Sequence, residues 1–401
     1  MKDQFVVPAR LKKTSFVLMG VGLLTLLIGL IAFQGENATR FWAGLLQNSS
    51  FFLLITLAST FFIAATTLAH GGWQIAFRRV PEAISMAVPV LAAILFVIVM
   101  ILVFGGKEDI YHWVNAHHVA EDKILTWKSA FLNKGFFTVA TILTLGLWIF
   151  FTMKLRKMSI EEDGWDLRPE TGRKLLWRNT VVCGGFLVVF TLSVGSTTPW
   201  VWLMSIDAHW FSTMYSWYTF ASTWVSGLSL IALFVVYLKK HGYLTYVTEE
   251  HLHDLGKFMF AFSIFWTYLW FSQYMLIWYA NMPEETEYFQ PRVWGQWRPI
   301  FFLNLLINFV TPLLFLMKRD TKRNYTAIVF IAIVIIFGHW LDFWQMVYPG
   351  TVKNLVFPWY EFGLGLGFVG LIIFLVSNQL TKASLVPKNH PYLKESIVHH
   401  T

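Results

Sequence analysis

Two short polar stretches interrupt apolar sequence and combine histidine with aspartate. One contains Asp207 and His209, and the other contains His339 and Asp342, both among tryptophan and phenylalanine residues. His339 and Asp342 are three positions apart, so on a helix their side chains share one face and can hydrogen-bond. Two such histidine–carboxylate pairs suit a quinol, whose head group needs a flat apolar slot and whose hydroxyls need a base. The pairs can equally conduct protons, or satisfy one another and hold two helices together.

The same histidines raise the question of a haem. His209 and His339 can lie at one level of the membrane, as two axial ligands of a haem b must. Such a haem needs small residues around it, whereas Trp210 and Trp340 crowd both positions. The sequence therefore favours a chain that binds no haem.

A second group of candidates lies near the ends of other apolar segments. Glu82 opens one segment directly after a proline, His253 and Asp254 open another, and His70 ends a third. A proline fits the first turn of a helix, and a carboxylate there is stabilised by the helix N-terminus. These residues either form the inner ends of proton half-channels or cap helices and form ion pairs at the membrane interface. Glu361, at the start of the last segment, allows the same two interpretations.

The composition indicates which elements must position these side chains. Of the 401 residues, 56% are hydrophobic and only 13% are charged, whereas an average soluble domain is about a quarter charged. This excludes a soluble enzyme and a disordered chain and predicts an all-α polytopic membrane protein, with residues 1–401 as one integral membrane domain.

Ten apolar segments are long enough to cross a bilayer as helices. They are 13–33, 42–69, 81–104, 131–153, 177–197, 210–238, 256–280, 299–317, 325–347 and 356–380. The first is too long for a signal peptide and no small-residue cleavage site follows it, so we expect a retained helix. The order of histidines, glycines and acids at the segment ends predicts two four-helix bundles, formed by helices 2–5 and 6–9 and flanked by helices 1 and 10.

The distribution of basic residues predicts the orientation. With a cytoplasmic N-terminus, 23 of the 31 lysine and arginine residues fall on the cytoplasmic side. An even number of helices then places both termini in the cytoplasm. The basic residues are spread over short connecting segments, which argues against nucleic-acid binding.

Redox and hydrolytic centres are not expected in this chain. Cys183 is the only cysteine, so neither an internal disulfide nor an iron–sulfur cluster can form. The sequence contains no phosphate-binding glycine loop, no zinc-protease motif and no nucleophile elbow. We therefore expect no catalytic residue, no bound metal and no cofactor, with quinol as the alternative ligand.

Four segments carry a resemblance to a known family. Residues 79–83, 205–218, 251–286 and 338–343 resemble the ActF subunits of bacterial alternative complex III, labelled quinol:cytochrome c oxidoreductase quinone-binding subunit 2, within the NrfD-like group of membrane subunits. The resemblance extends over nearly the whole chain. It implies ten helices arranged as two four-helix bundles with two extra helices, in the bacterial inner membrane.

The resemblance also implies a place in electron transport. It implies membrane lipids, a sister subunit ActC, an iron–sulfur subunit, multihaem cytochrome c subunits, small membrane subunits and a haem–copper oxidase as partners, with the iron–sulfur clusters and haems c in those partners. The expected function is a cofactor-free, structural and proton-conducting subunit of a complex that oxidises quinol. The alternatives are a stand-alone proton- or ion-coupled transporter, for which only Pro89 and Pro312 interrupt apolar segments, and a purely scaffolding subunit.

Overall fold

The computed structural model describes residues 4–166 and 168–400, and these residues form helices and connecting loops. Helix accounts for 79% of the structure, and the described ranges contain no strand. Within the same ranges, nine helices are long and apolar enough to cross a membrane. The chain is therefore an all-helical, multi-pass membrane protein, as its composition predicts.

Each of the ten predicted segments is helical over most of its length. The long helices are α1 (Ala9–Ala32), α2 (Ala38–Leu68), α4 (Val88–Phe104), α7 (Lys134–Glu161), α8 (Pro169–Val194), α9 (Met214–Lys240), α10 (Glu249–Ala280), α16 (Tyr325–Thr351) and α17 (Trp359–Leu380). The predicted segment 81–104 is divided into α3 (Arg79–Ser85) and α4, and 299–317 consists of α13 (Arg298–Leu305), the π-helix η7 (Leu306–Val310) and α14 (Thr311–Leu316). α10 is long enough to cross a membrane but is not one of the nine apolar crossings found in the described chain, which include 79–104 and 298–316 as single crossings.

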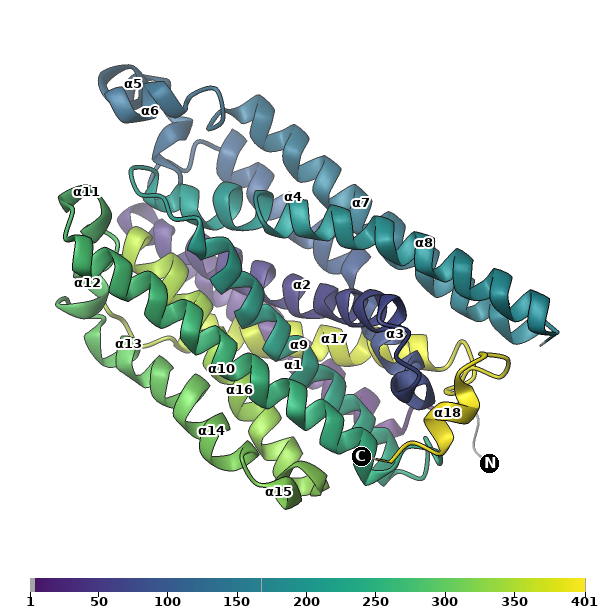
Figure 1. Cartoon of the computed structure of the whole chain (residues 1–401). Helices are drawn as coiled ribbons and strands as arrows, with labels where there is room; N and C mark the ends of the chain where they lie inside the picture. The colour runs from purple at the N-terminus through teal and green to yellow at the C-terminus, as the bar shows by residue number, and fades with distance from the viewer. Residues whose placement is uncertain (1–3, 167, 401) are drawn as a thin grey trace.

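Short helices cap the two ends of the bundle. Figure 1 shows α5 (Ala116–Glu121), α6 (Lys123–Lys128), α11 (Pro283–Thr286) and α12 (Gln290–Val293) at one end, and α3, α15 (Arg319–Arg323) and α18 (Leu393–Ile397) at the other. Both ends of the described chain lie at the end that holds α18. We call this the inner end, after the predicted orientation, and the opposite end the outer end.

Helices α2 and α9 form the centre of the structure. Both are mostly buried, and each contacts the other as well as α16. They approach closely because small residues face each other: a Cβ added at Gly227 of α9 would lie 2.4 Å from the Cβ of Ala58 on α2. Their many Ser and Thr side chains donate to carbonyls of their own helices, as Thr56 does to Leu53 at 2.8 Å. These polar groups can therefore lie inside the apolar interior without a partner on another helix.

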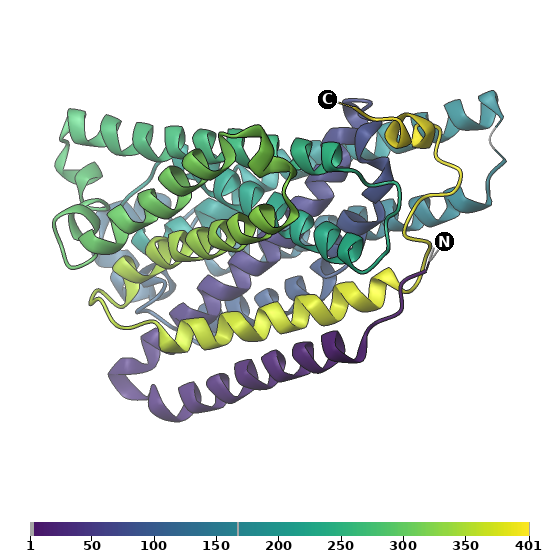
Figure 2. The ribbon, with the colours of Figure 1, turned by 90° about the horizontal axis from the view of Figure 1, so that it is seen from below.

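Helix α1 packs mainly against α17, on one side of the molecule (Figure 2). A Cβ added at Gly22 would lie 2.4 Å from the Cα of Gly367, and one at Gly363 would lie 2.4 Å from the hydroxyl of Thr25. Glycine is required at these positions because the two backbones nearly touch. The opposite face of α1 is exposed, as expected for a helix that borders lipid.

Candidate functional site

Asp342 lies at the centre of a buried polar cluster near the outer end of α16. Its side chain is 0% exposed. Tyr218 of α9 and Asn304 of α13 donate to Oδ1, the latter at 2.7 Å, and the indole of Trp266 on α10 donates to Oδ2 at 3.0 Å. One carboxylate therefore joins four helices, α9, α10, α13 and α16, through strong charge-assisted hydrogen bonds.

His339 is the neighbour of Asp342 on the same helix face, as their spacing predicts. Its Nδ1 lies 3.8 Å from Oδ2 of Asp342 and 3.1 Å from the hydroxyl of Ser222. The ring is buried, stacks edge-on against Trp266, and its Nε2 has no hydrogen-bond partner among the described residues. A small shift of the ring would bring Nδ1 within hydrogen-bonding range of the carboxylate, so the pair can exchange a proton.

The amides beside Asp342 extend the cluster. Asn308 donates to Asn304 at 2.5 Å, and Asn304 also donates to the side-chain oxygen of Gln345 at 3.3 Å. Asn308 belongs to the π-helix η7, which begins two residues after Asn304. Such single π-turns occur often at functional sites. Two amides four residues apart in an apolar segment are a signal that sequence reasoning missed, as it did the role of Tyr218.

Asp207 lies toward the outer surface from this cluster. It belongs to η6 (Met204–Asp207), and its carboxylate lies 3.6 Å from the guanidinium of Arg292 on α12. Arg292 also donates to the backbone oxygen of Gln345 at 3.2 Å and stacks on the ring of Tyr288. Because the Asp207 side chain is 25% exposed, this series of groups leads from buried Asp342 toward the surface.

A small cavity lies between the Asp342 cluster and Arg292, the partner of Asp207. Its volume is about 10 Å³, and Tyr218, Gln273, Arg292 and Gln345 line it. A cavity of this size holds about one water molecule. It is far smaller than the several hundred cubic ångströms of a typical small-molecule pocket, so its dimensions suit a proton carrier and not a quinol head group.

His209 does not pair with Asp207, contrary to the expectation of two similar histidine–aspartate pairs. It lies at the surface, where its Nε2 is 2.5 Å from Asp122 in the loop before α6. This hydrogen bond, together with bonds from backbone N–H groups, holds the pKa of the Asp122 carboxyl below its ordinary value. Because both side chains are partly exposed, they form a surface pair that ties the outer loops together. A haem held between His209 and His339 does not fit this arrangement, since one is exposed and the other is buried.

Glu82 is buried at the inner end and is bound by arginines. Its carboxylate oxygens lie 3.1 Å from Arg78, 3.7 Å from Arg79 and 2.9 Å from Arg156 of α7. The Glu82 side chain is 1% exposed. Glu82 is in the first turn of α3, as predicted, but its partners are guanidinium groups and not backbone N–H groups of its own helix. This arrangement holds α3 against α7.

Glu162, which the sequence did not single out, lies close to Glu82 and its three arginines, which we call the inner cluster. It is 0% exposed in η4 (Glu162–Gly164), and its Oε1 accepts a hydrogen bond from Asn179 at 2.6 Å. Its Oε2 has no hydrogen-bond partner within the described chain. Glu162 follows α7 within a short run of acids, and nothing in that run distinguishes it from its neighbours.

The other inner candidates lie apart from Glu82 in different surroundings. Asp254 on α10 pairs with Lys257 at 2.6 Å and with His399 at 2.7 Å. His253, next to it, is buried, whereas His70 is exposed where α2 ends, with a φ of 51°. Asp254 thus fastens the segment after α18 to α10.

Glu361 is held at the outer end in the same manner as Glu82. Arg40 of α2 donates to both of its oxygens, at 2.8 and 3.0 Å, and the hydroxyl of Tyr348 donates at 2.5 Å. The side chain is 0% exposed. These bonds, which include a bidentate ion pair, join α2, α16 and α17.

Comparison with known proteins adds no assignment: no protein-family model matches the chain, and no curated protein matches it. The described residues contain no group of three or more His, Cys, Asp or Glu side chains that could hold a metal ion. The candidate site is therefore defined by its geometry alone.

Proposed function

We propose that this chain is a multi-pass subunit of a membrane complex that oxidises quinol, and that Asp342 and His339 conduct protons within it. The chain itself has a structural role and binds no redox cofactor, so electrons pass through partner subunits. The support for the family is the resemblance of residues 79–83, 205–218, 251–286 and 338–343 to ActF subunits of alternative complex III.

The observation that carries the proton-conducting role is the environment of Asp342. The other acids singled out from the sequence each pair with an arginine or a lysine; they are Glu82, Asp207, Asp254 and Glu361. Asp342 forms no such pair with a described residue and faces only neutral donors and His339. A buried acid at membrane depth with no cation paired to it is a functional candidate by default, and His339, 3.8 Å away on the same helix face, is the acid–base group with which it can exchange a proton.

The proposal places the proton path in the outer half of the molecule. Protons pass between His339 and Asp342, then through the water-sized cavity beside Gln345 and Arg292 to Asp207. At the inner end, Glu162 is a better candidate for proton uptake than Glu82, since Glu82 is occupied by three arginines. Quinol, in this proposal, binds in a partner subunit.

The proposed topology has ten crossings with both termini in the cytoplasm of a bacterial cell. It adds α10 to the nine apolar crossings. α10 has 32 residues and packs along α9 and α14. Helices α2, α4, α7 and α8 pack together, as do α9, α10, α14 and α16, which supports two four-helix bundles. The partners in this proposal are a sister bundle subunit, an iron–sulfur subunit, multihaem cytochromes c, small membrane subunits and a haem–copper oxidase.

The membership in a redox complex is tested by purification. We expect the chain, isolated in mild detergent from its native membrane, to migrate with subunits that contain haem c and iron–sulfur clusters. Haem and iron analysis measures this directly. A chain that migrates alone, without haem or iron, contradicts the proposal and favours the stand-alone transporter.

The proton-conducting role is tested by Asp342→Asn in the assembled complex. Losing a positioned acid–base group lowers the rate of a proton-transfer step by about 10²-fold or more, so we expect proton release and coupled quinol oxidation to slow together. Asp122→Asn, in the surface pair, is the matched control and leaves both rates unchanged. Unchanged rates in an assembled Asp342→Asn complex would leave Asp342 with a purely structural role.

A further inference from the structure

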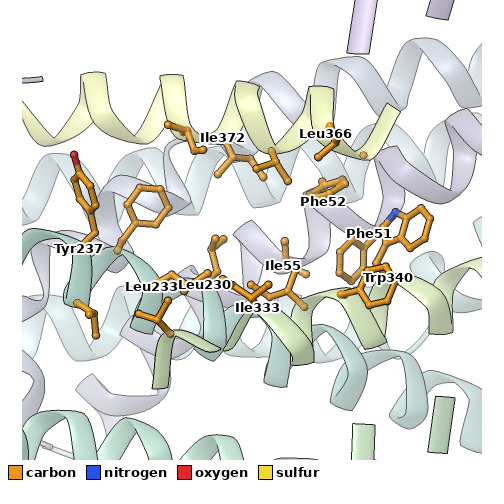
Figure 3. A pocket seen from close by; sticks show the side chains of 18 of the residues that line it. Phe51, Phe52, Ile55, Leu230, Leu233, Tyr237, Ile333, Trp340, Leu366 and Ile372 are labelled. Atoms are coloured by element: carbon orange, nitrogen blue, oxygen red, sulfur yellow. The ribbon is translucent and has the colours of Figure 1, made fainter. Parts of the chain in front are cut away.

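A long apolar groove lies between α2, α9, α16 and α17, away from the Asp342 cluster. Its volume is about 710 Å³, and its lining is almost entirely hydrocarbon (Figure 3). The floor is formed by Phe51 and Ile55 of α2 and Ile372 of α17, which are 0 to 3% exposed. Ile333 and Phe337 of α16 also line the groove and are 54% and 41% exposed, so it opens to the lipid-facing surface.

The inner end of the groove is basic. Lys240, at the last residue of α9, lines it together with Leu11 of α1. Lys240 is exposed and forms no ion pair with a described residue. Next to Leu11, the exposed residues Lys12 and Lys13 of α1 carry two further positive charges. At the opposite end, the groove is closed by aromatic side chains, including Trp340, whose indole is already bonded to Asn48.

We infer that this groove binds one anionic phospholipid of the inner leaflet, with an acyl chain along the floor and the phosphate beside Lys240. Basic pockets between membrane helices on the cytoplasmic side are typical sites for anionic head groups. An apolar groove that begins at an ammonium group and ends in aromatic rings has the polarity of such a lipid. The inference rests on the proposed orientation, which makes the Lys240 end cytoplasmic, but not on proton conduction or on membership in a redox complex.

The length of the groove agrees with a single leaflet. Along α16 the lining extends from Val329 to Trp340, which at about 1.5 Å per residue is about 16 Å. Half of a hydrocarbon core is about 15 Å thick. A transmembrane helix of a partner needs roughly twice that length.

The head-group chemistry separates a phospholipid from a quinone. A quinone ring is neutral and requires hydrogen-bonding groups on both sides, whereas the polar groups that line this groove, the Tyr237 hydroxyl and the Lys240 ammonium, both lie on the last turn of α9. The Lys240 ammonium, with Lys12 and Lys13 following Leu11 in the sequence, instead matches a phosphate.

The test uses the full chain in nanodiscs that contain equal amounts of phosphatidylglycerol and phosphatidylcholine, with a long-chain isoprenoid quinone added. After gentle extraction, native mass spectrometry counts the molecules that each protein retains. We expect one retained phosphatidylglycerol. Ile372→Trp, which fills the floor, should abolish its retention, and Leu233→Trp on the opposite wall gives an independent filled variant if the first fails to fold. Val188→Trp, on the lipid-facing side of α8, is the control and should retain the lipid.

The charge at the inner end is tested separately. Lys240→Ala should lower the preference for phosphatidylglycerol over phosphatidylcholine about fivefold, since one cation at a membrane surface contributes about that factor. Lys318→Ala, also exposed at the inner end but outside the groove, should not change it. Retention of the quinone in place of phospholipid, equal retention of both phospholipids by the wild type, or undiminished retention by a folded filled variant overturns the inference.

Discussion

Replacing Glu82 by glutamine should destabilise the protein strongly. The substitution keeps the volume of the side chain but removes the negative charge that pairs with Arg78, Arg79 and Arg156. Breaking a buried ion pair by removing one partner costs about 3–5 kcal/mol, because the remaining charge stays buried without compensation. Arg78 and Arg156 lose a partner at 3.1 and 2.9 Å, whereas Arg79 keeps its ion pair with Asp163 at 3.0 Å, so we expect a loss of about 3–5 kcal/mol.

The measurement is the free energy of unfolding in mixed micelles as the fraction of sodium dodecyl sulfate rises. Glu170→Gln, an exposed acid in the first turn of α8, is the matched control and should change that free energy by no more than about 0.5 kcal/mol. The double variant Glu82→Gln/Arg156→Gln should be more stable than the sum of the single effects predicts, by about 1 kcal/mol or more. If Glu82→Gln is as stable as the control, Glu82 does not hold the inner cluster together, and a role in proton uptake becomes the better explanation.

Two further predictions concern helix packing and pH. Gly22→Ala should destabilise the protein by about 1–3 kcal/mol in the same assay, since the new Cβ would lie 2.4 Å from the Cα of Gly367, whereas Gly20→Ala, with no atom within 4 Å, should not. Burial, together with the charges of Arg78 and Arg79, holds the pKa of His390 well below its ordinary value of 6.5. His390 lies in the C-terminal segment that packs against Arg78, and there it binds fewer protons than it would if the segment were released. Packing of this segment is therefore strongest above pH 6.5 and weakens by up to about 1.4 kcal/mol per pH unit below it. Hydrogen exchange of residues 388–398, compared with the unfolded exchange rate at each pH, measures this, and His390→Gln should reduce the weakening below pH 6.5.

The helices were predictable because hydrophobicity along the chain is a local property. The segment 325–347 and α16 begin at the same residue, and 42–69 differs from α2 by a few residues. Apolar length does not reveal a break in backbone hydrogen bonding, however. The interruption between α3 and α4 and the π-turn of η7 depend on how neighbouring helices pack, so the sequence alone did not indicate them.

The candidate site was predictable only where its partners lie on one helix. His339 and Asp342 are neighbours because a helix places positions three apart on one face. The partners of Asp207 and His209 come from other elements: Arg292 from α12 and Asp122 from the loop before α6. Such pairings arise from tertiary packing, and no regular spacing in the sequence encodes them.

The glycine contact between α1 and α17 has a consequence for the order of assembly. The adjacent ion pair of Arg40 and Glu361 joins residues 321 positions apart, so α1 and α2 enter the membrane long before their partners on α17 exist. During that interval the glycine face of α1 borders lipid and is available to other helices with small residues. A chain that lacks α17 should therefore self-associate through α1, which cross-linking between α1 helices in the membrane can detect. Packing of α17 against the glycine face of α1 then completes the fold and excludes other helices from that face.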